Sequence, residues 1–90
     1  KYGRMRRAYL KDHRPALYST LLLTEKLFPH LAEIDAACKT RLEIIEAEMM
    51  CRESVTEALK AADQMEWVRR RNSIHSRAEE IVLHELVYAE

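Results

Sequence analysis

Two groups of basic side chains in this chain of 90 residues are candidates for binding phosphate groups. The first group recurs at intervals of three and four, which places its members on one face of a helix. This basic stripe consists of Arg4, Arg7, Lys11 and Arg14. The second group is the consecutive Arg triplet of Arg69, Arg70 and Arg71. Because arginine and lysine bind DNA phosphates, all of these residues are candidate nucleic-acid-binding residues if folding places both groups on one surface.

The same residues have a second interpretation, in which they pair with acidic side chains of the same chain. Residues 1–14 carry six basic residues against one acidic residue, and residues 15–66 carry five against ten. The last segment, 67–90, carries four of each, so the net charge of zero is a sum of opposed blocks. An acidic helix over 33–53 could neutralise the basic stripe, although each exposed ion pair stabilises by only about 0–1 kcal/mol. The sequence leaves both interpretations open.

The histidines give only fragments of a metal site. Two pairs of residues are spaced at i and i+4, where two side chains of one helix can bind the same metal ion: His75 with Glu79, and Glu80 with His84. The same spacing is typical of ordinary surface ion pairs. The sequence has no HExxH pattern, and no Glu-x-x-His pair on two separate helices. We therefore expect no metal ligands.

The cysteines and the glycine content argue against an enzyme. Cys38 and Cys51 would lie about 20 Å apart on one helix, which is beyond disulfide reach. Nothing nearby in the sequence would activate either thiol as a nucleophile. Gly3 is the one glycine, so Gly-rich phosphate-binding loops are excluded. We expect no catalytic residues and no cofactor, and a protein that acts by binding.

The elements that must position these residues are predicted to be helices, because Ala, Leu, Glu, Arg and Lys dominate the composition. Pro15 and Pro29 mark helix starts. Ser54 followed by Glu57 has the capping-box spacing, and Asp63 suits the N-cap of a last helix. The expected helices cover 2–12, 15–25, 30–53, a short connecting segment at 54–62, and 64–88. The helix over 15–25 is apolar on more than one side, so we expect it to be covered on more than one side.

Two heptad-spaced stripes indicate how the long helices pack. Leu31, Cys38 and Ile45 repeat every seven residues in the first long helix. In the last helix the residues repeating at seven are Trp67, Ile74, Ile81 and Tyr88. We interpret these four as core or interface anchors. A Trp67→Ala substitution would cost about 3–5 kcal/mol if the ring lies in a core.

The predicted architecture is all-α: an elongated helical bundle of two long antiparallel helices plus two or three shorter ones. We expect one domain over residues 1–90, lacking a native N-terminal extension. Apolar length that the short helices leave uncovered favours a homo-oligomer. No apolar run approaches 18 residues, so neither a transmembrane span nor a membrane partner is expected.

Several segments, in order along nearly the whole chain, resemble the TnpV family of transposon-encoded proteins of bacterial (Firmicutes) mobile elements. The matching segments are YLKDHR at 9–14, LLLTEKL at 21–27, HLAEID at 30–35, VTEALK at 55–60, DQMEWV at 63–68, NSI at 72–74 and EIVLHELVY at 80–88. The chain departs from the family pattern at Glu25, where a Ser-Gly-Lys-Leu form is usual, and at Arg70, where a small residue is usual. Glu25 thus favours a helix that continues to Lys26 over a tight turn.

The resemblance implies a context without a mechanism. It implies an accessory protein of a mobile element, cytoplasmic, whose partner is DNA, a recombinase or another protein of the element. The alternative is a helical protein-interaction or homo-oligomeric scaffold with no nucleic-acid contact. The geometric question that separates them is whether the basic stripe and the Arg triplet converge on one surface.

Overall fold

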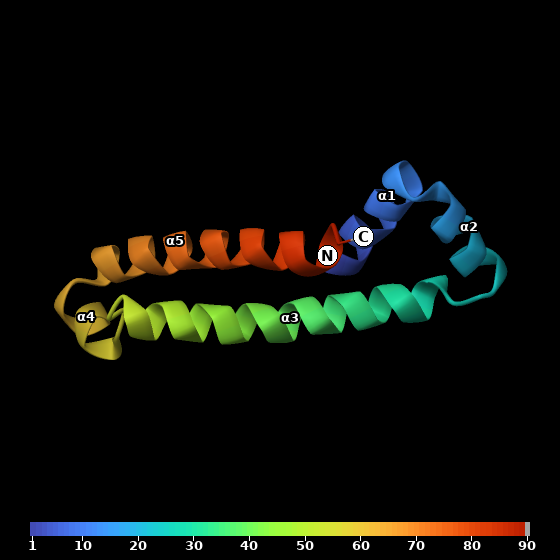
Figure 1. The fold of residues 1–90 in the computed structure, drawn as a ribbon. Coiled ribbons are helices and arrows are strands. Elements are labelled where there is room, and N and C mark those ends of the chain that lie inside the picture. Colours follow the sequence, from blue (N-terminus) through green and yellow to red (C-terminus); the bar gives the residue numbers. More distant parts are fainter. Residues whose placement is uncertain (90) are drawn as a thin grey trace.

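The computed structural model describes residues 1–89 as a chain of helices, and it contains no strand within that range. The elements are α1 (Tyr2–His13), α2 (Pro15–Leu23), α3 (Leu27–Arg52), α4 (Glu57–Ala62), α5 (Gln64–Val82) and the π-helical segment η1 (Leu83–Val87) (Figure 1). The predicted all-α class is confirmed. Glu90, the last residue of the predicted domain, lies outside the described residues.

The molecule is long and thin. Its extents are 55 × 19 × 18 Å, and its radius of gyration is 16.8 Å, whereas a compact chain of this length has about 12 Å. The 26 residues of α3 account for about 39 Å of that length. The chain reverses its direction at α4, and α5 runs back beside α3 (Figure 1). At the other end, α1 packs against both α3 and η1, so the two ends of the chain lie close together.

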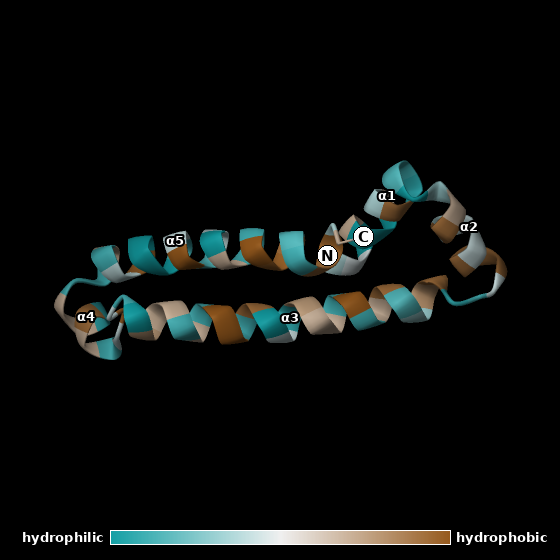
Figure 2. Ribbon diagram, in the orientation of Figure 1, coloured by the Kyte–Doolittle hydropathy of each residue, from teal (hydrophilic) through white to brown (hydrophobic). Residues whose placement is uncertain are grey.

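The core is a narrow seam between helices. Apolar residues are spread along the whole length of α3 and α5 (Figure 2). The predicted α3 stripe of Leu31, Cys38 and Ile45 is buried, as expected. The largest cluster of buried residues joins α1, α3, α5 and η1, and consists of Tyr2, Cys38, Ile45, Ala78, Val82 and Val87. A seam of this kind leaves much of each helix exposed.

The expected coverage of α2 is wrong. None of its residues is buried, although its sequence is mostly apolar. It contacts only α1 and α3 within the described chain. Leu22 and Leu23 at its end are exposed, Leu23 by 82%. The short turns on both sides of α2 hold it at the end of the molecule, where no other helix reaches it (Figure 1).

Two helix ends differ from the prediction, because the chain makes tight turns without glycine. The helix α2 ends at Leu23 and does not continue to Lys26. Glu25 takes a left-handed backbone with φ of 61°. The N–H groups of Glu25 and Lys26 donate to the carbonyl oxygens of Leu22 and Leu21, which is the Schellman pattern. Glycine is the residue that best suits this conformation, and Glu25 adopts it here.

The turn after α3 repeats this pattern and displaces the predicted cap. Ser54 is also left-handed, with φ of 57°, and lies outside the following helix. Thr56 caps α4 instead, where its side chain accepts the N–H of Leu59. Asp63 caps α5 as predicted, accepting the N–H of Glu66 at 3.1 Å. The capping-box spacing identified a helix start correctly but assigned it to a residue two positions too early.

Candidate nucleic-acid interface

Three members of the basic stripe lie on one exposed face of α1. Arg4, Arg7 and Lys11 are exposed, and together with Ala8 they line a shallow hollow of about 340 Å³. None of the three forms an ion pair with another residue of the range 1–89. We call these three residues the basic face of α1. The predicted pairing of this stripe with the acidic residues of α3 is therefore wrong for the described residues.

Arg14 does not share that face. It connects α1 to α2 with a non-helical backbone (φ −136°, ψ 60°), and its side chain is half-buried. Its N–H donates to the carbonyl oxygen of Leu10 at 2.9 Å and so ends α1. Pro15 explains this geometry, because the residue before a proline is disfavoured in the α conformation. The spacing placed Arg14 on the stripe, but the chain turns there.

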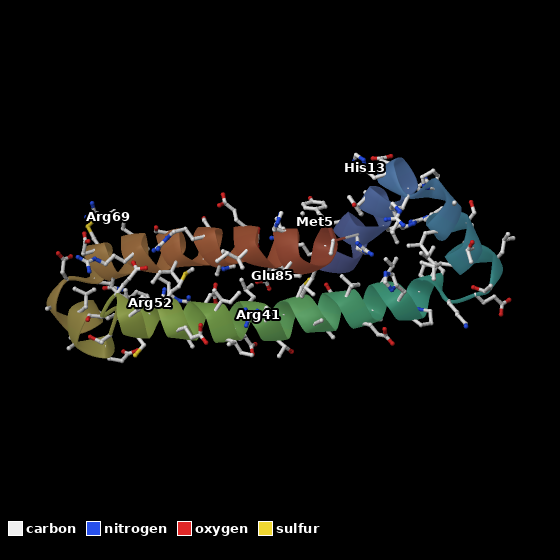
Figure 3. The ribbon with its side chains drawn as sticks, viewed as in Figure 1. Met5, His13, Arg41, Arg52, Arg69 and Glu85 are labelled. Carbon is white, nitrogen blue, oxygen red and sulfur yellow. The ribbon has the colours of Figure 1, made fainter. Side chains whose placement is uncertain are left out.

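The Arg triplet lies elsewhere, and each of its members is ion-paired. Arg70 Nε donates to Glu66 at 2.8 Å, and Arg69 also pairs with Glu66. Arg71 lies 3.5 Å from the carboxylate of Glu46 on α3. Figure 3 shows Arg69 at the α4 end of the molecule, whereas α1 lies at the other end. The two predicted groups are therefore not brought together on one surface.

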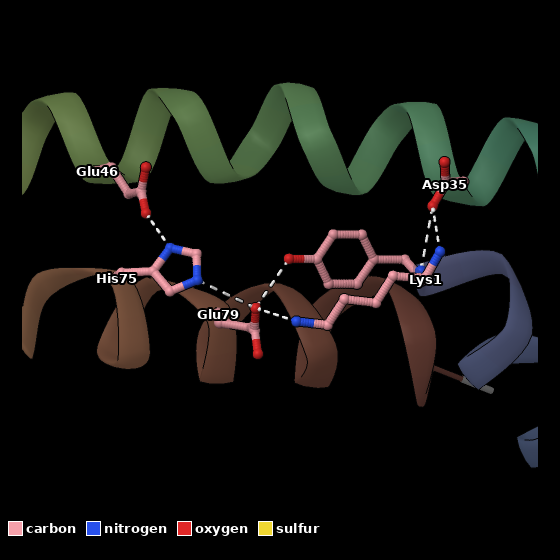
Figure 4. Close-up of polar contacts among 6 residues, drawn as sticks. Lys1, Asp35, Glu46, His75 and Glu79 are labelled. Atoms are coloured by element: carbon pink, nitrogen blue, oxygen red, sulfur yellow. Dashed lines mark hydrogen bonds and ion pairs between the residues drawn. The ribbon is translucent and has the colours of Figure 1, made fainter. Parts of the chain in front are cut away.

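Two acidic residues of α3 form ion pairs. Asp35 pairs with Lys39 and with the N-terminal ammonium, and Glu46 pairs with Arg71 and His75 of α5. Figure 4 shows part of the network between the helices. Nδ1 of His75 lies 2.6 Å from Glu46, which is buried, and Nε2 lies 3.4 Å from Glu79. Glu79 also accepts hydrogen bonds from the Lys1 ammonium (2.9 Å) and the Tyr2 hydroxyl (3.0 Å). The predicted His75–Glu79 contact is thus present, as part of a network that joins three helices.

The network shifts two pKa values in directions that follow from these contacts. The Lys1 ammonium and the Tyr2 hydroxyl lower the pKa of Glu79, because both hydrogen bonds favour the carboxylate. Burial, followed by the hydrogen bond to Glu79, raises the pKa of Tyr2 to about 12. Within residues 1–89 no group of three or more His, Cys, Asp or Glu side chains could hold a metal ion. The contacts of the network join α1, α3 and α5.

Arg6 is a basic residue with a structural role that was not predicted from the sequence. Its side chain is 6% exposed, and Nη1 donates to the carbonyl oxygens of Val87 (3.0 Å) and Ala89. A signal was present in the sequence, because Arg6 lies midway between Tyr2 and Leu10, four residues from each, on the buried face of α1. Its guanidinium is also 3.4 Å from Nε2 of His30. Burial and the Arg6 charge together lower the pKa of His30.

Only one of the predicted anchors lies in the core of the chain. Ile74 is fully buried, and Trp67 is half-buried with the Lys60 ammonium 4.8 Å from its ring centre. Ile81 and Tyr88 are 37% and 45% exposed, so neither is a core anchor. The buried line of α5 instead runs through residues four apart: Ile74, Ala78 and Val82. A role for the exposed anchors in an interface stays a prediction.

Tyr88 is exposed because the last helix changes its geometry. The α-helix ends at Val82, and the next turn is π-helical, with the N–H of Tyr88 bonded to the carbonyl oxygen of Leu83 at 2.8 Å. The wider turn shifts every later side chain around the axis. As a result Val87 is buried, and the Tyr88 ring lies beside Tyr9 with 5.6 Å between ring centres. A heptad pattern read from the sequence cannot detect this change.

These features describe a thin, all-helical protein with a basic face on its first helix. The chain belongs to the family described as transposon-encoded protein TnpV, whose family model matches residues 1–87. The resemblance predicted from the sequence is confirmed. Comparison with curated proteins and with solved structures gave no match. No helix of the described residues is long and apolar enough to cross a membrane.

Proposed function

We propose that this protein is an accessory protein of its mobile element that binds duplex DNA through the basic face of α1. The observation that carries the proposal is the contrast between the chain's basic groups. Arg4, Arg7 and Lys11 are exposed and have no acidic partner within residues 1–89, whereas the Arg triplet is held by Glu66 and Glu46. Charges without a partner are available to phosphates. Binding of this kind is independent of sequence and would take place in the cytoplasm, where we expect the protein to act.

The number of cations on the basic face of α1 sets the strength and salt dependence of this binding. Each phosphate contact contributes about −0.9 to the slope of log K against log salt for duplex DNA. Three contacts therefore predict a slope of about −3, and binding by both original groups would have given about twice that value. A small slope means weak binding alone, so a second copy or another protein of the element would have to add affinity.

A duplex titration at several salt concentrations tests the proposal. The test variant Arg4→Gln/Arg7→Gln removes two cations of the basic face. The matched control Arg69→Gln/Arg70→Gln removes two cations that are already paired. We expect the slope to become shallower in the test variant, from about −3 to about −1, and to stay near −3 in the control.

Two outcomes would contradict the proposal. Equal losses in both variants would show that binding follows total charge, and no binding by wild-type protein at low salt would exclude a DNA-binding role. Helicity by circular dichroism should match wild type in both variants, because all four substituted side chains are exposed.

The exposed α2 favours a second candidate function, a helical protein-interaction scaffold with no nucleic-acid contact. Leu22 and Leu23 are exposed, and Phe28 at the start of α3 is 70% exposed. Apolar side chains gathered at one end of a molecule are typical of a protein-binding surface. A recombinase or another protein of the element would be the partner. A failed duplex titration would leave this scaffold role as the proposed function.

A further inference from the structure

The long helix α3 carries a second heptad pattern on a side that the rest of the chain leaves uncovered. The outer stripe repeats at intervals of three and four, and consists of Ala37, Thr40, Ile44, Ala47 and Cys51. All five side chains are exposed, Ile44 by 46%. Among residues 1–89 no other helix runs along the side of α3 that faces away from α5, although Leu86 of η1 borders the stripe (Figure 1). The stripe is therefore separate from the buried one that faces α5.

Part of the outer stripe forms an apolar groove with the end of the chain. Ala36, Ala37, Thr40 and Ile44 of α3 line a hollow of about 450 Å³ together with Leu86 of η1. Arg41 also lines it, and its Nε donates to Glu85 of η1 at 3.2 Å. Alternating three- and four-residue spacing keeps apolar side chains facing a partner helix along a coiled coil. The small residues allow that helix to approach closely, while Ile44 and Leu86 supply the large apolar contacts. The geometry fits a helix lying along α3.

We propose that the occupant is α3 of a second copy of this chain, packed antiparallel. The charges beside the stripe favour this orientation over a parallel one. In a parallel pair, Glu43 of one copy would face Glu48 of the other, which places like charges together. In an antiparallel pair, Arg41, which is exposed and also pairs with Glu85 of its own chain, faces Glu48 of the second copy. Symmetry makes this contact twice. The same register places Ile44 against the small Ala47 of the second copy.

The single chain exposes more surface than a globular protein of its mass. Its accessible surface is 6262 Å², whereas a monomeric chain of 10.6 kDa typically exposes about 5,500 Å². The excess of about 800 Å² follows from the elongated shape of the molecule, which leaves the outer stripe accessible along α3. This proposal does not depend on DNA binding.

Sedimentation velocity over a range of concentrations tests the interface. Ile44→Asp places a charge in the centre of the outer stripe and should raise the dimer dissociation constant at least tenfold. The matched control is Val68→Asp on α5, where the exposed fraction of the side chain is 41%, and it should leave the constant unchanged. A wild-type monomer at high micromolar concentration, or an equal effect of the control, would overturn the proposal.

One further variant tests the orientation. Glu48→Arg places two cations face to face in the antiparallel pair, so the dissociation constant should rise about fivefold. In a parallel pair the new cation would face Glu43 and strengthen the dimer, and that result would overturn the antiparallel assignment. The variant Arg41→Glu/Glu48→Arg restores opposite charges in the antiparallel pair and, combined with Glu85→Gln to remove the like charge beside position 41, should return the constant close to the wild-type value.

Discussion

The arginine side chains of this chain lie in three different environments. Arg7 is exposed without a partner in the described range, Arg70 is paired within its own helix, and Arg6 is buried. Burying a guanidinium is costly unless its donors are satisfied. For Arg6 the acceptors are carbonyl oxygens at the end of η1, where the helix dipole is negative. The net charge of zero therefore says little about which cations are free to bind a partner.

The buried position of Arg6 predicts a large effect on stability. Arg6→Ala removes hydrogen bonds to the carbonyl oxygens of Val87 and Ala89, and it leaves both oxygens without this partner. We expect the free energy of unfolding to fall by about 2 kcal/mol, since hydrogen bonds that involve a charged group contribute about 1.5–3 kcal/mol. Urea denaturation followed by circular dichroism measures this change.

The neighbouring residue provides the control. Arg7→Ala removes the same side chain from the exposed side of α1, and it should change the free energy of unfolding by less than about 0.5 kcal/mol. Similar losses in the two variants would mean that Arg6 does not hold the end of η1.

At the scale of elements, both ends of α3 are set by turns that lack their preferred residue. Glu25 precedes α3 and Ser54 follows it, and both have positive φ. A non-glycine residue costs about 1–2 kcal/mol in this conformation. The turns persist because their hydrogen bonds are made and because Leu27 and Val55, which follow the two residues, are buried.

Glycine at these two positions should therefore stabilise the protein. We expect Glu25→Gly and Ser54→Gly each to raise the free energy of unfolding by about 0.5–1 kcal/mol, because relief of strain exceeds the extra entropy of the unfolded chain. Thermal unfolding at fixed protein concentration measures both changes. The control Glu33→Gly, in the exposed helical part of α3, should lower the free energy of unfolding by about 1 kcal/mol. Destabilisation by all three variants would contradict the left-handed assignment.

The sequence predicted the elements whose signals are local. Pro15 marked the start of α2, Asp63 marked the start of α5, and the Leu31-Cys38-Ile45 stripe marked the buried side of α3. What could not be predicted depends on contacts between distant residues. The turn at Glu25 has no glycine to reveal it, and the π-helical turn before Tyr88 goes with burial of Val87 and its contact to Arg6.

The candidate site was predicted only in part, because local spacing does not determine how separate helices pack. The spacing of Arg4, Arg7 and Lys11 was enough to place them on one face, because all three belong to the same helix. Whether the Arg triplet shares that surface depends on where α1 packs, and α1 packs at the η1 end of α3. Local spacing therefore identified each group but not their separation.

At the scale of the whole molecule, charged contacts compensate for a thin core. Three carboxylates have lowered pKa values, because each accepts a hydrogen bond from a nearby cation. The pairs are Asp35 with Lys39, Glu53 with Arg77, and Glu79 with Lys1. Two of them join different elements, so protonation of these carboxylates weakens the contacts that hold the long molecule together.

Stability should therefore fall on acidification. In the unfolded chain these carboxylates bind protons near pH 4 to 4.5, before the folded chain does, because their folded pKa values are lower. Their contribution is complete above about pH 5 and is lost as the pH falls through the folded pKa values. Urea unfolding at pH 6, 4.5 and 3.5 should show the decrease. Glu79→Gln should make it shallower, since Glu79 joins α5 to α1, whereas Glu80→Gln, without an ion pair in residues 1–89, should not. A decrease that is equally steep in all three proteins would mean that the acid sensitivity arises outside the network between the helices.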